Sequence, residues 1–266
     1  MSISGQSAVH ERLVPTLTTL PRPLFARNES LARAERTRMH SHSWIQLSYA
    51  ISGVLHVHTP HESFVAPPQR AVWIPSDVEH QVFSFANTEM RSLYIDEQLI
   101  GRNANRCRVI EINALTHELI KQFCQLDAEY DLQGEEGRLA LVLIDQLRMA
   151  KEVSMSLPLP QDHRVIQLCR RLQESPDDDR TLAEWGNELG ASEKTLRRIL
   201  MRETGMTFRG WRQRMRLLGA LEDLGQGIKV TQVALNSGYQ STSAFIAAFR
   251  AHFGTTPGDF FPDRNT

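Results

Sequence analysis

The sequence has little cysteine and no long apolar run. Its three cysteines, Cys107, Cys124 and Cys169, are odd in number, widely spaced and without a CxxC pair. We therefore expect free thiols in a reducing cytoplasm rather than a disulfide framework or a zinc ribbon. Apolar runs stay as short as "ALVLI" at 140–144, and no basic stretch followed by an apolar one opens the chain. We expect neither a membrane span nor a secretory signal.

Acidic residues are scarce in one segment, although the whole chain is nearly neutral with 30 basic and 31 acidic residues. Between Lys194 and Arg216 there are eight basic residues and a single acid, Glu203. A solvated helix face would normally interleave acids at i+4 spacing. Because acids are nearly absent, the segment favours a surface that binds a polyanion, with the solvated face as the alternative.

The first part of the chain has the pattern of short β-strands. From about 37 to 95, runs such as "WIQLSYAISGVLHVHT" at 44–59 alternate around β-branched and aromatic residues, with Gly53 and several prolines as breaks. Such spacing is typical of a small barrel or sandwich.

Beyond residue 113 the apolar period becomes helical. The residues that recur at this spacing are Leu115, Leu119, Phe123 and Leu126, then Leu139, Leu143 and Leu147. Two amphipathic helices after an all-β unit could cover its open end or form a dimer interface. Both interpretations stay open at this stage.

A proline-containing string, "SMSLPLPQD" at 154–162, interrupts the helical pattern. Residues before proline favour extended conformations, so the string predicts a linker. With 266 residues the chain is long enough for two modest domains. We place them at 1–155 and 162–266, joined by the linker 156–161.

Two helices separated by a short turn follow the linker. Thr181 and Glu184 have the spacing of a capping box, and Gly190 can end the helix that they begin. Ser192 then caps a second helix that stops at Gly205. A helix, a turn of about three residues and a second helix form a helix-turn-helix, here at about 181–204.

The same pattern recurs 49 residues later, at about 229–253. The matched positions are Ser192/Ser241, Leu196/Phe245, Leu200/Phe249, Gly205/Gly254, Thr207/Thr256 and Trp211/Phe260. Six matches at one offset, each with a structural role, predict a second helix-turn-helix. Between the copies, residues 208–224 form one helical segment that would span ~25 Å. Such a rod could place two helices in major-groove segments that recur every ~34 Å of B-DNA.

The exposed side chains of the two second helices are candidates for reading bases. On the first, Leu196, Ile199 and Leu200 would face inward, which leaves Lys194, Arg197 and Arg198 for guanine or for phosphate. On the second, the outward residues are Thr242, Ser243, Ala247 and Arg250. Further phosphate contacts are expected from Arg202, Arg209 and Arg212.

Three stretches carry a family resemblance: "TLAEWGNELGASEKTLRRIL", "GMTFRGWRQRMRLLGALEDL" and "VALNSGYQSTSAFIAAFRAHFGTTPGDF". They make residues 181–262 resemble the AraC/XylS family of bacterial transcription regulators. The resemblance implies sequence-specific binding of double-stranded DNA, which activates or represses a promoter, with RNA polymerase as the partner of an activator. It implies base contacts at Lys194, Arg197 and Arg198 and at Thr242, Ser243 and Ala247. Two departures are Ala247, where some members have a polar residue, and Gly186, where alanine is common.

The N-terminal part resembles the cupin-type sensor domains that many of these regulators carry. "HSHSWIQL" and "PSDVEH" place His40, His42, Gln46 and His80 where cupins have three histidines and a glutamate as metal ligands. The resemblance implies a cupin-like β-barrel with a site for a small effector or a divalent transition metal, which imidazoles suit. A vestigial barrel, whose histidines only form hydrogen bonds, is the alternative.

We therefore predict an α+β protein of two domains, with a cupin-like β-barrel plus helices followed by an all-α double helix-turn-helix. Its expected function is transcription regulation in the cytoplasm, in association with the nucleoid, by a homodimer without enzymatic activity. One alternative is a cupin metalloenzyme with a helical appendage, which would need a metal with an open coordination position. A second is a constitutive DNA binder without an inducer.

Overall fold

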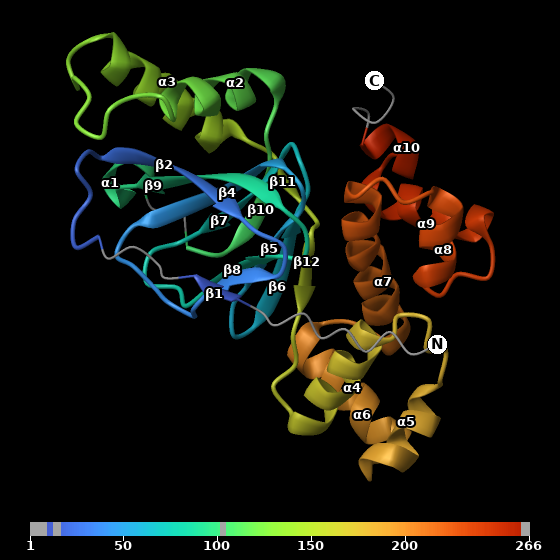
Figure 1. Cartoon of the computed structure of the whole chain (residues 1–266). Helices are drawn as coiled ribbons and strands as arrows, with labels where there is room; N and C mark the ends of the chain where they lie inside the picture. Colours follow the sequence, from blue (N-terminus) through green and yellow to red (C-terminus); the bar gives the residue numbers. More distant parts are fainter. Residues whose placement is uncertain (1–9, 13–16, 102–104, 262–266) are drawn as a thin grey trace. The chain divides into compact units, whose positions relative to one another are not determined.

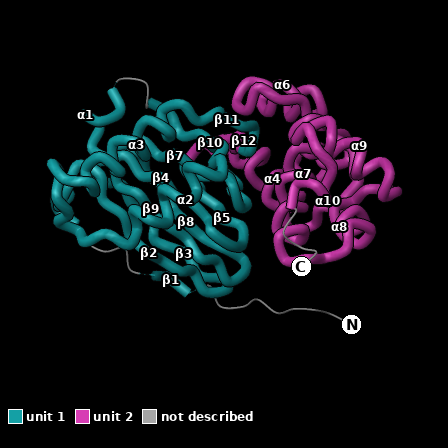
Figure 2. The backbone as a smooth tube through the Cα atoms, turned by 90° about the horizontal axis from the view of Figure 1, so that it is seen from above, with its two compact units in different colours: residues 1–59, 64–155 teal, residues 60–63, 156–266 magenta. Residues whose placement is uncertain are grey.

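The computed structural model describes residues 10–12, 17–101 and 105–261. The chain divides into two compact units (Figure 2), one of residues 1–59 and 64–155 and one of residues 60–63 and 156–266. The first contains two β-sheets and short helices, and the second is mainly helical. The predicted α+β fold is confirmed. None of the described helices is both long and apolar enough to cross a membrane.

Two sheets form the β-rich unit. The first sheet includes, as neighbours in this order, β1 (His10–Arg12), β3 (Glu35–Thr37), β8 (Gln81–Ser84), β5 (Leu55–His58) and β6 (Glu62–Ala66). The second has the order β11 (Glu152–Val153), β10 (Arg108–Glu111), β7 (Arg70–Ile74), β4 (Ile45–Ser52), β9 (Thr88–Ile95) and β2 (Leu24–Leu31). Neighbouring strands of the second sheet are antiparallel, so side chains on one face can pack across strands.

One face of the second sheet is covered by two helices, α2 (Ala114–Phe123) and α3 (Glu135–Met149) (Figure 1). A short helix, α1 (Glu97–Ile100), follows β9. Alternate residues of the strands pack with Ile120, Phe123, Leu143 and Leu147 into a single apolar core. In α2 the buried residues are Thr116, Ile120 and Phe123, while Leu115, which shares the helical spacing of Leu119 and Phe123, is 55% exposed. Leu115, Leu119 and Phe123 are spaced by four residues and form one stripe along the helix. The stripe that packs on the sheet is instead Thr116, Ile120 and Phe123, so Leu115 lies beside the contact and not in it.

The second unit begins with a strand where the sequence predicts a linker. β12 (Ser156–Pro158) lies within 156–161, and α4 (His163–Glu174) follows it. The Trp211 indole Nε1 donates to the Pro158 carbonyl oxygen at 2.8 Å. The prolines favour extended backbone, as predicted, but part of the segment is ordered, since the Leu159 N–H also donates to the carbonyl oxygen of His61, a residue of the same unit, at 2.8 Å.

In the described part of this unit six further helices follow: α5 (Leu182–Leu189), α6 (Glu193–Thr204), α7 (Phe208–Gly225), α8 (Val230–Asn236), α9 (Thr242–Phe253) and α10 (Pro257–Phe260). The 18-residue α7 is the central rod (Figure 1), with α4–α6 near one end and α8–α10 near the other. Its buried side includes Trp211, Leu217, Leu221 and Leu224, each at most 1% exposed. Both helical pairs therefore share one apolar support.

The repeat at an offset of 49 is visible in the helix ends. Ser192 and Ser241 each accept a hydrogen bond from the backbone N–H three residues on, as N-caps do. Gly205 and Gly254 have φ of 68° and 81°, a left-handed conformation that ends each helix. Thr181 and Glu184 form the predicted capping box. The pairs Leu196/Leu200 and Phe245/Phe249 are all at most 1% exposed.

Gly186 has a structural explanation in the turn after α5. The Ala191 N–H donates to the Gly186 carbonyl oxygen at 3.0 Å, which folds the turn back onto the helix. A Cβ at position 186 would lie 2.4 Å from the Ala191 carbonyl oxygen. Alanine would therefore push the turn, and the start of α6, away from α5.

We predict opposite effects for alanine at two helical glycines. Gly186→Ala should destabilise the protein by roughly 1–3 kcal/mol through this backbone clash. Gly219→Ala on α7 is the matched control: no atom lies within 4 Å of its added Cβ, and the change should stabilise by up to ~1 kcal/mol. Urea unfolding followed by far-ultraviolet circular dichroism measures both. Shifts of the same sign would contradict this explanation of Gly186.

Candidate nucleic-acid interface and histidine site

One face of α6 is apolar and buried, and the other carries exposed cations. Leu196, Ile199 and Leu200 are 1%, 3% and 1% exposed and pack inward. The exposed side chains are Lys194, Arg197, Arg198, Met201 and Arg202. The structure thus brings the three predicted base-reading residues of the first copy onto one solvent-facing surface. They stay predictions as base contacts.

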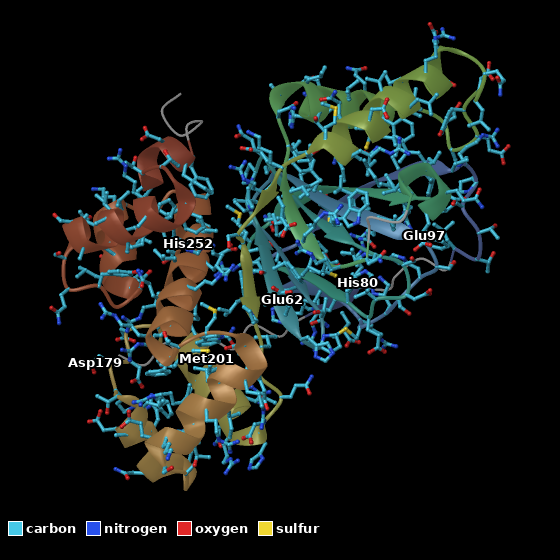
Figure 3. All side chains as sticks on the ribbon, turned by 180° about the vertical axis from the view of Figure 1, so that it is seen from behind. Glu62, His80, Glu97, Asp179, Met201 and His252 are labelled. Atoms are coloured by element: carbon cyan, nitrogen blue, oxygen red, sulfur yellow. The ribbon has the colours of Figure 1, made fainter. Side chains whose placement is uncertain are left out.

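Two neighbours of the predicted readers stand out in the structure. Glu193 forms an i,i+4 ion pair with Arg197, which orients the guanidinium along the helix. Met201, which is labelled in Figure 3, is 44% exposed and lies one helical turn beyond Arg197. Its thioether is an apolar group of the kind that contacts thymine methyls. The signal for Met201 in the sequence was its i+4 spacing from Arg197.

Glu203, the lone acid of the basic segment, binds backbone N–H groups at the start of α4. Its Oε2 accepts hydrogen bonds from the backbone N–H groups of Gln161 and Asp162 at 2.9 and 3.0 Å. The bond from Asp162 is the main reason why the pKa of the Glu203 carboxyl lies below its usual value. Glu203 therefore anchors the start of α4 to the end of α6.

The exposed face of α9 is small and weakly polar. Ser243, Ala247 and Arg250 are exposed and Thr242 is half-buried, while Phe245 and Phe249 are fully buried beneath them. Small hydroxyl and methyl groups allow close approach to a groove but form few strong hydrogen bonds. Most of the electrostatic attraction to DNA is therefore expected from α6.

The three arginines predicted to contact phosphate differ in their surroundings. Arg202 and Arg209 are exposed. Arg212 is half-buried: its Nη1 donates to the Arg180 carbonyl oxygen at 2.8 Å, and its guanidinium lies 4.9 Å from the centre of the Phe208 ring. Arg212 thus has a role inside the unit, and all three phosphate contacts stay predictions.

The β-rich unit brings its four predicted site residues together. The ring nitrogens of His40, His42 and His80 offer one atom each within 4.8 Å of one another. An isolated antiparallel bridge joins His40 to His80 through N–H···O bonds of 3.0 and 2.8 Å. The Asp77 N–H donates to the His42 carbonyl oxygen at 2.8 Å, which ties the loop before His80 to the loop that contains His40 and His42. His80, labelled in Figure 3, is fully buried.

The hydrogen bonds of the three rings favour metal ligation by Nε2. Each ring directs Nδ1 at a backbone carbonyl oxygen two residues away, at 2.8–2.9 Å. A carbonyl oxygen only accepts, so Nδ1 carries the proton and Nε2 keeps its lone pair, as in ligating histidines. Burial lowers the pKa of His40, and lowers that of His80 to about 3, so both rings are neutral at pH 7.

Gln46 is the fourth member of the site. Its side-chain Oε1 lies 2.8 Å from Nε2 of His42 and 3.3 Å from Nε2 of His80, and its Nε2 lies 2.9 Å from Ser48 Oγ. Because both ring Nε2 atoms keep a lone pair, the amide satisfies them by presenting its NH2 group to the imidazoles and its oxygen to the Ser48 hydroxyl. A carboxylate could only accept.

Aromatic rings that sequence reasoning missed surround His42. The Trp44 ring is nearly parallel to the imidazole, with centres 5.1 Å apart, and the Tyr94 ring meets it edge-on at 5.8 Å. Trp44 is close in sequence, but Tyr94 lies on another strand, so only the register of β4 with β9 places it there.

Comparison with known proteins identifies both parts of the chain. Residues 23–142 match the AraC-like ligand binding domain, and residues 185–262 match a helix-turn-helix domain. The HTH-type transcriptional regulator NimR of Escherichia coli K12 is 32% identical over 222 residues, which cover 84% of this chain and 81% of NimR.

The chain belongs to the AraC/XylS family. It is an AraC-type DNA-binding transcriptional regulator with an N-terminal ligand-binding domain, and its target is double-stranded DNA. The regulator RipA of Corynebacterium glutamicum is 33% identical over 103 residues, 39% of this chain and 31% of RipA. A crystal structure of ToxT from Vibrio cholerae O395 is 12% identical, covers 92% of this chain and 99% of ToxT, and gives a TM-score of 0.40.

For this AraC-type regulator we predict that Arg197→Ala relaxes the preference at one base pair by ~1–3 kcal/mol, because a guanidinium can bond guanine O6 and N7 together. A binding assay over all single-base variants of a selected duplex measures it. Arg209→Ala, an exposed arginine of α7, is the control and should weaken every sequence alike. Uniform weakening by Arg197→Ala would contradict its assignment as a base reader.

Proposed function

We propose that this regulator acts in the cytoplasm as a homodimer and controls a promoter in response to a metal ion or small molecule sensed by its β-rich unit. RNA polymerase is its partner where it activates. The observation that carries the sensing role is the convergence of three imidazoles, each with Nδ1 bonded to a carbonyl, beside Gln46.

The residues of this site fit a divalent transition metal. His40, His42 and His80 would hold the ion through Nε2, with the Gln46 side-chain oxygen as a neutral neighbour. Imidazoles suit zinc, copper, iron and nickel, and the lack of a carboxylate leaves the filled site with its full double charge. Bound there, the ion would cross-link the loop that contains His40 and His42 to the residue that precedes β8.

Sensing is favoured over catalysis by three observations. The chain has two helix-turn-helix motifs, which a cupin metalloenzyme does not need. Gln46 replaces the carboxylate that the cupin resemblance leads one to expect, which removes a negative charge from the metal site. The relative NimR is also a transcriptional regulator by name.

We predict that the full chain binds about one Zn²⁺ or Ni²⁺ ion, measured by calorimetry after treatment with a chelator. His42→Ala should weaken binding by roughly 10–100-fold or more, since it removes a ligand. Gln46→Glu should tighten it by adding an anionic oxygen. His163→Ala, on the exposed surface of α4, is the control and should have no effect. Equal affinity in wild type and His42→Ala would exclude the site.

The homodimer is proposed from the outer face of α3. Its buried residues pack on the sheet, but Leu141, Val142 and Met149 are 58%, 47% and 77% exposed. The same face carries Arg138 and Asp145, both exposed. Water-exposed aliphatic residues in the middle of a helix, with charges on both sides, are typical of an interhelical contact.

The charges on this face are self-complementary. In an antiparallel pair of α3 helices centred between Leu141 and Val142, these two residues would meet each other across the two-fold axis. Arg138 and Asp145 are equally distant from that centre, so each would face the other in the second copy. A two-fold interface brings the same patch of both subunits together, which this arrangement satisfies. We therefore assign the face to a second copy of the chain.

A charge exchange tests the dimer. Arg138→Asp alone would place two carboxylates opposite each other, and Asp145→Arg alone would place two guanidinium groups opposite each other. We expect each variant to dimerise at least ~10-fold more weakly than wild type, since opposed like charges cost more than ~1 kcal/mol when partly desolvated. An equimolar mixture should form heterodimers, as seen by analytical ultracentrifugation with one copy labelled. Two variants that dimerise like wild type, or a mixture that stays monomeric, would contradict the α3 interface.

A further inference from the structure

The guanidinium of Arg216, on α7, connects two segments that are distant in sequence. Its Nε donates to the Pro176 carbonyl oxygen at 2.7 Å and its Nη2 to that of Asp178 at 3.0 Å. Both acceptors lie in the connection between α4 and α5, which leads into the first helix-turn-helix. Its Nη1 donates to the Gly238 carbonyl oxygen at 3.2 Å. Gly238 lies in the turn of the second helix-turn-helix.

The two segments also touch each other directly at Gly238. Its φ is 73°, and an added Cβ would lie 2.7 Å from Asp177 Cα and 2.8 Å from both the Pro176 carbonyl oxygen and Arg216 Nη2. Only glycine therefore permits this approach of backbone to backbone. The turn of the second motif is thus held against the connection that leads into the first motif, in addition to the support that both motifs have from α7.

The geometry points to Arg216 as a positioning residue that fixes the spacing and angle of the two helix-turn-helix motifs. Its planar guanidinium has donors at fixed angles, so three carbonyls bonded at once determine the orientation of both backbone segments relative to α7. A lysine ammonium keeps the charge but has no such fork. Arg216 is half-buried, whereas Arg209 on the same helix is exposed.

The consequence concerns DNA that both motifs read together. When the first motif is bound to DNA, the second motif has a high effective concentration near the same duplex. If its position is fixed, this advantage applies only to the groove segment that lies within its reach. Inserting one base pair between the two segments rotates the second by about 35° and shifts it by ~3.4 Å. A rigid pair of motifs must discriminate strongly against that change, and a hinged pair tolerates it.

The test uses the full chain and a duplex selected with the wild-type protein from a random pool. Variants of this duplex gain or lose one or two base pairs between the two recognised segments. We expect wild type to lose roughly 10-fold or more in affinity for each such change. Arg216→Lys and Gly238→Ala should bind the original duplex more weakly but lose less than about 3-fold on insertion, because their second motif is hinged.

Arg209→Ala is the matched control for loss of an α7 cation: it should lower affinity for every duplex and keep the wild-type dependence on spacing. Measurements are made below the melting temperature of each variant, so that unfolding is separated from positioning. Arg216→Lys removes the guanidinium from the contact, and Gly238→Ala adds a Cβ to the backbone that the guanidinium binds. If both keep the wild-type dependence on spacing, whatever their overall affinity, the inference is overturned.

Discussion

The DNA-binding unit depends on the burial of one side of α7. Trp211, Leu217 and Leu221 exclude water along this helix, and both helix-turn-helix motifs pack near its ends. Each motif contributes an apolar pair, Leu196/Leu200 or Phe245/Phe249, to its own inner face. Because these residues must face inward, the opposite sides of α6 and α9 are presented to solvent. The charge of α6 and the small side chains of α9 are thus displayed as a result of packing.

In the β-rich unit, one face of the second sheet carries the apolar core and the other face carries buried polar side chains. One face is sealed by α2 and α3, while Gln46, Ser48 and Ser92 are buried polar residues at alternate positions. Buried polar groups need partners, and here the Gln46 amide has them in Ser48 and two imidazoles. The histidine site is therefore part of a satisfied network, in which a bound ion or effector would replace existing bonds.

The repeat could be predicted from the sequence because every matched position is determined locally. A serine that caps a helix or a glycine in a left-handed conformation leaves a signal within four residues. The grouping of His40, His42, Gln46 and His80 was predicted by resemblance alone. Features that the sequence alone does not determine depend on distant partners: Leu115 is exposed because the sheet meets another face of α2, and Arg216 bonds carbonyls 22 to 40 residues away. Gly186, unexplained by the sequence, follows from a turn that folds back on its own helix.

We expect one chain to read two successive major-groove segments on the same side of the duplex. Hydroxyl-radical footprinting of the full chain on a duplex selected from a random pool tests it most directly. We predict two protected stretches for each bound chain, about 10 base pairs apart and on one face of the DNA. A single protected stretch for each chain, or two stretches on opposite faces, would contradict it.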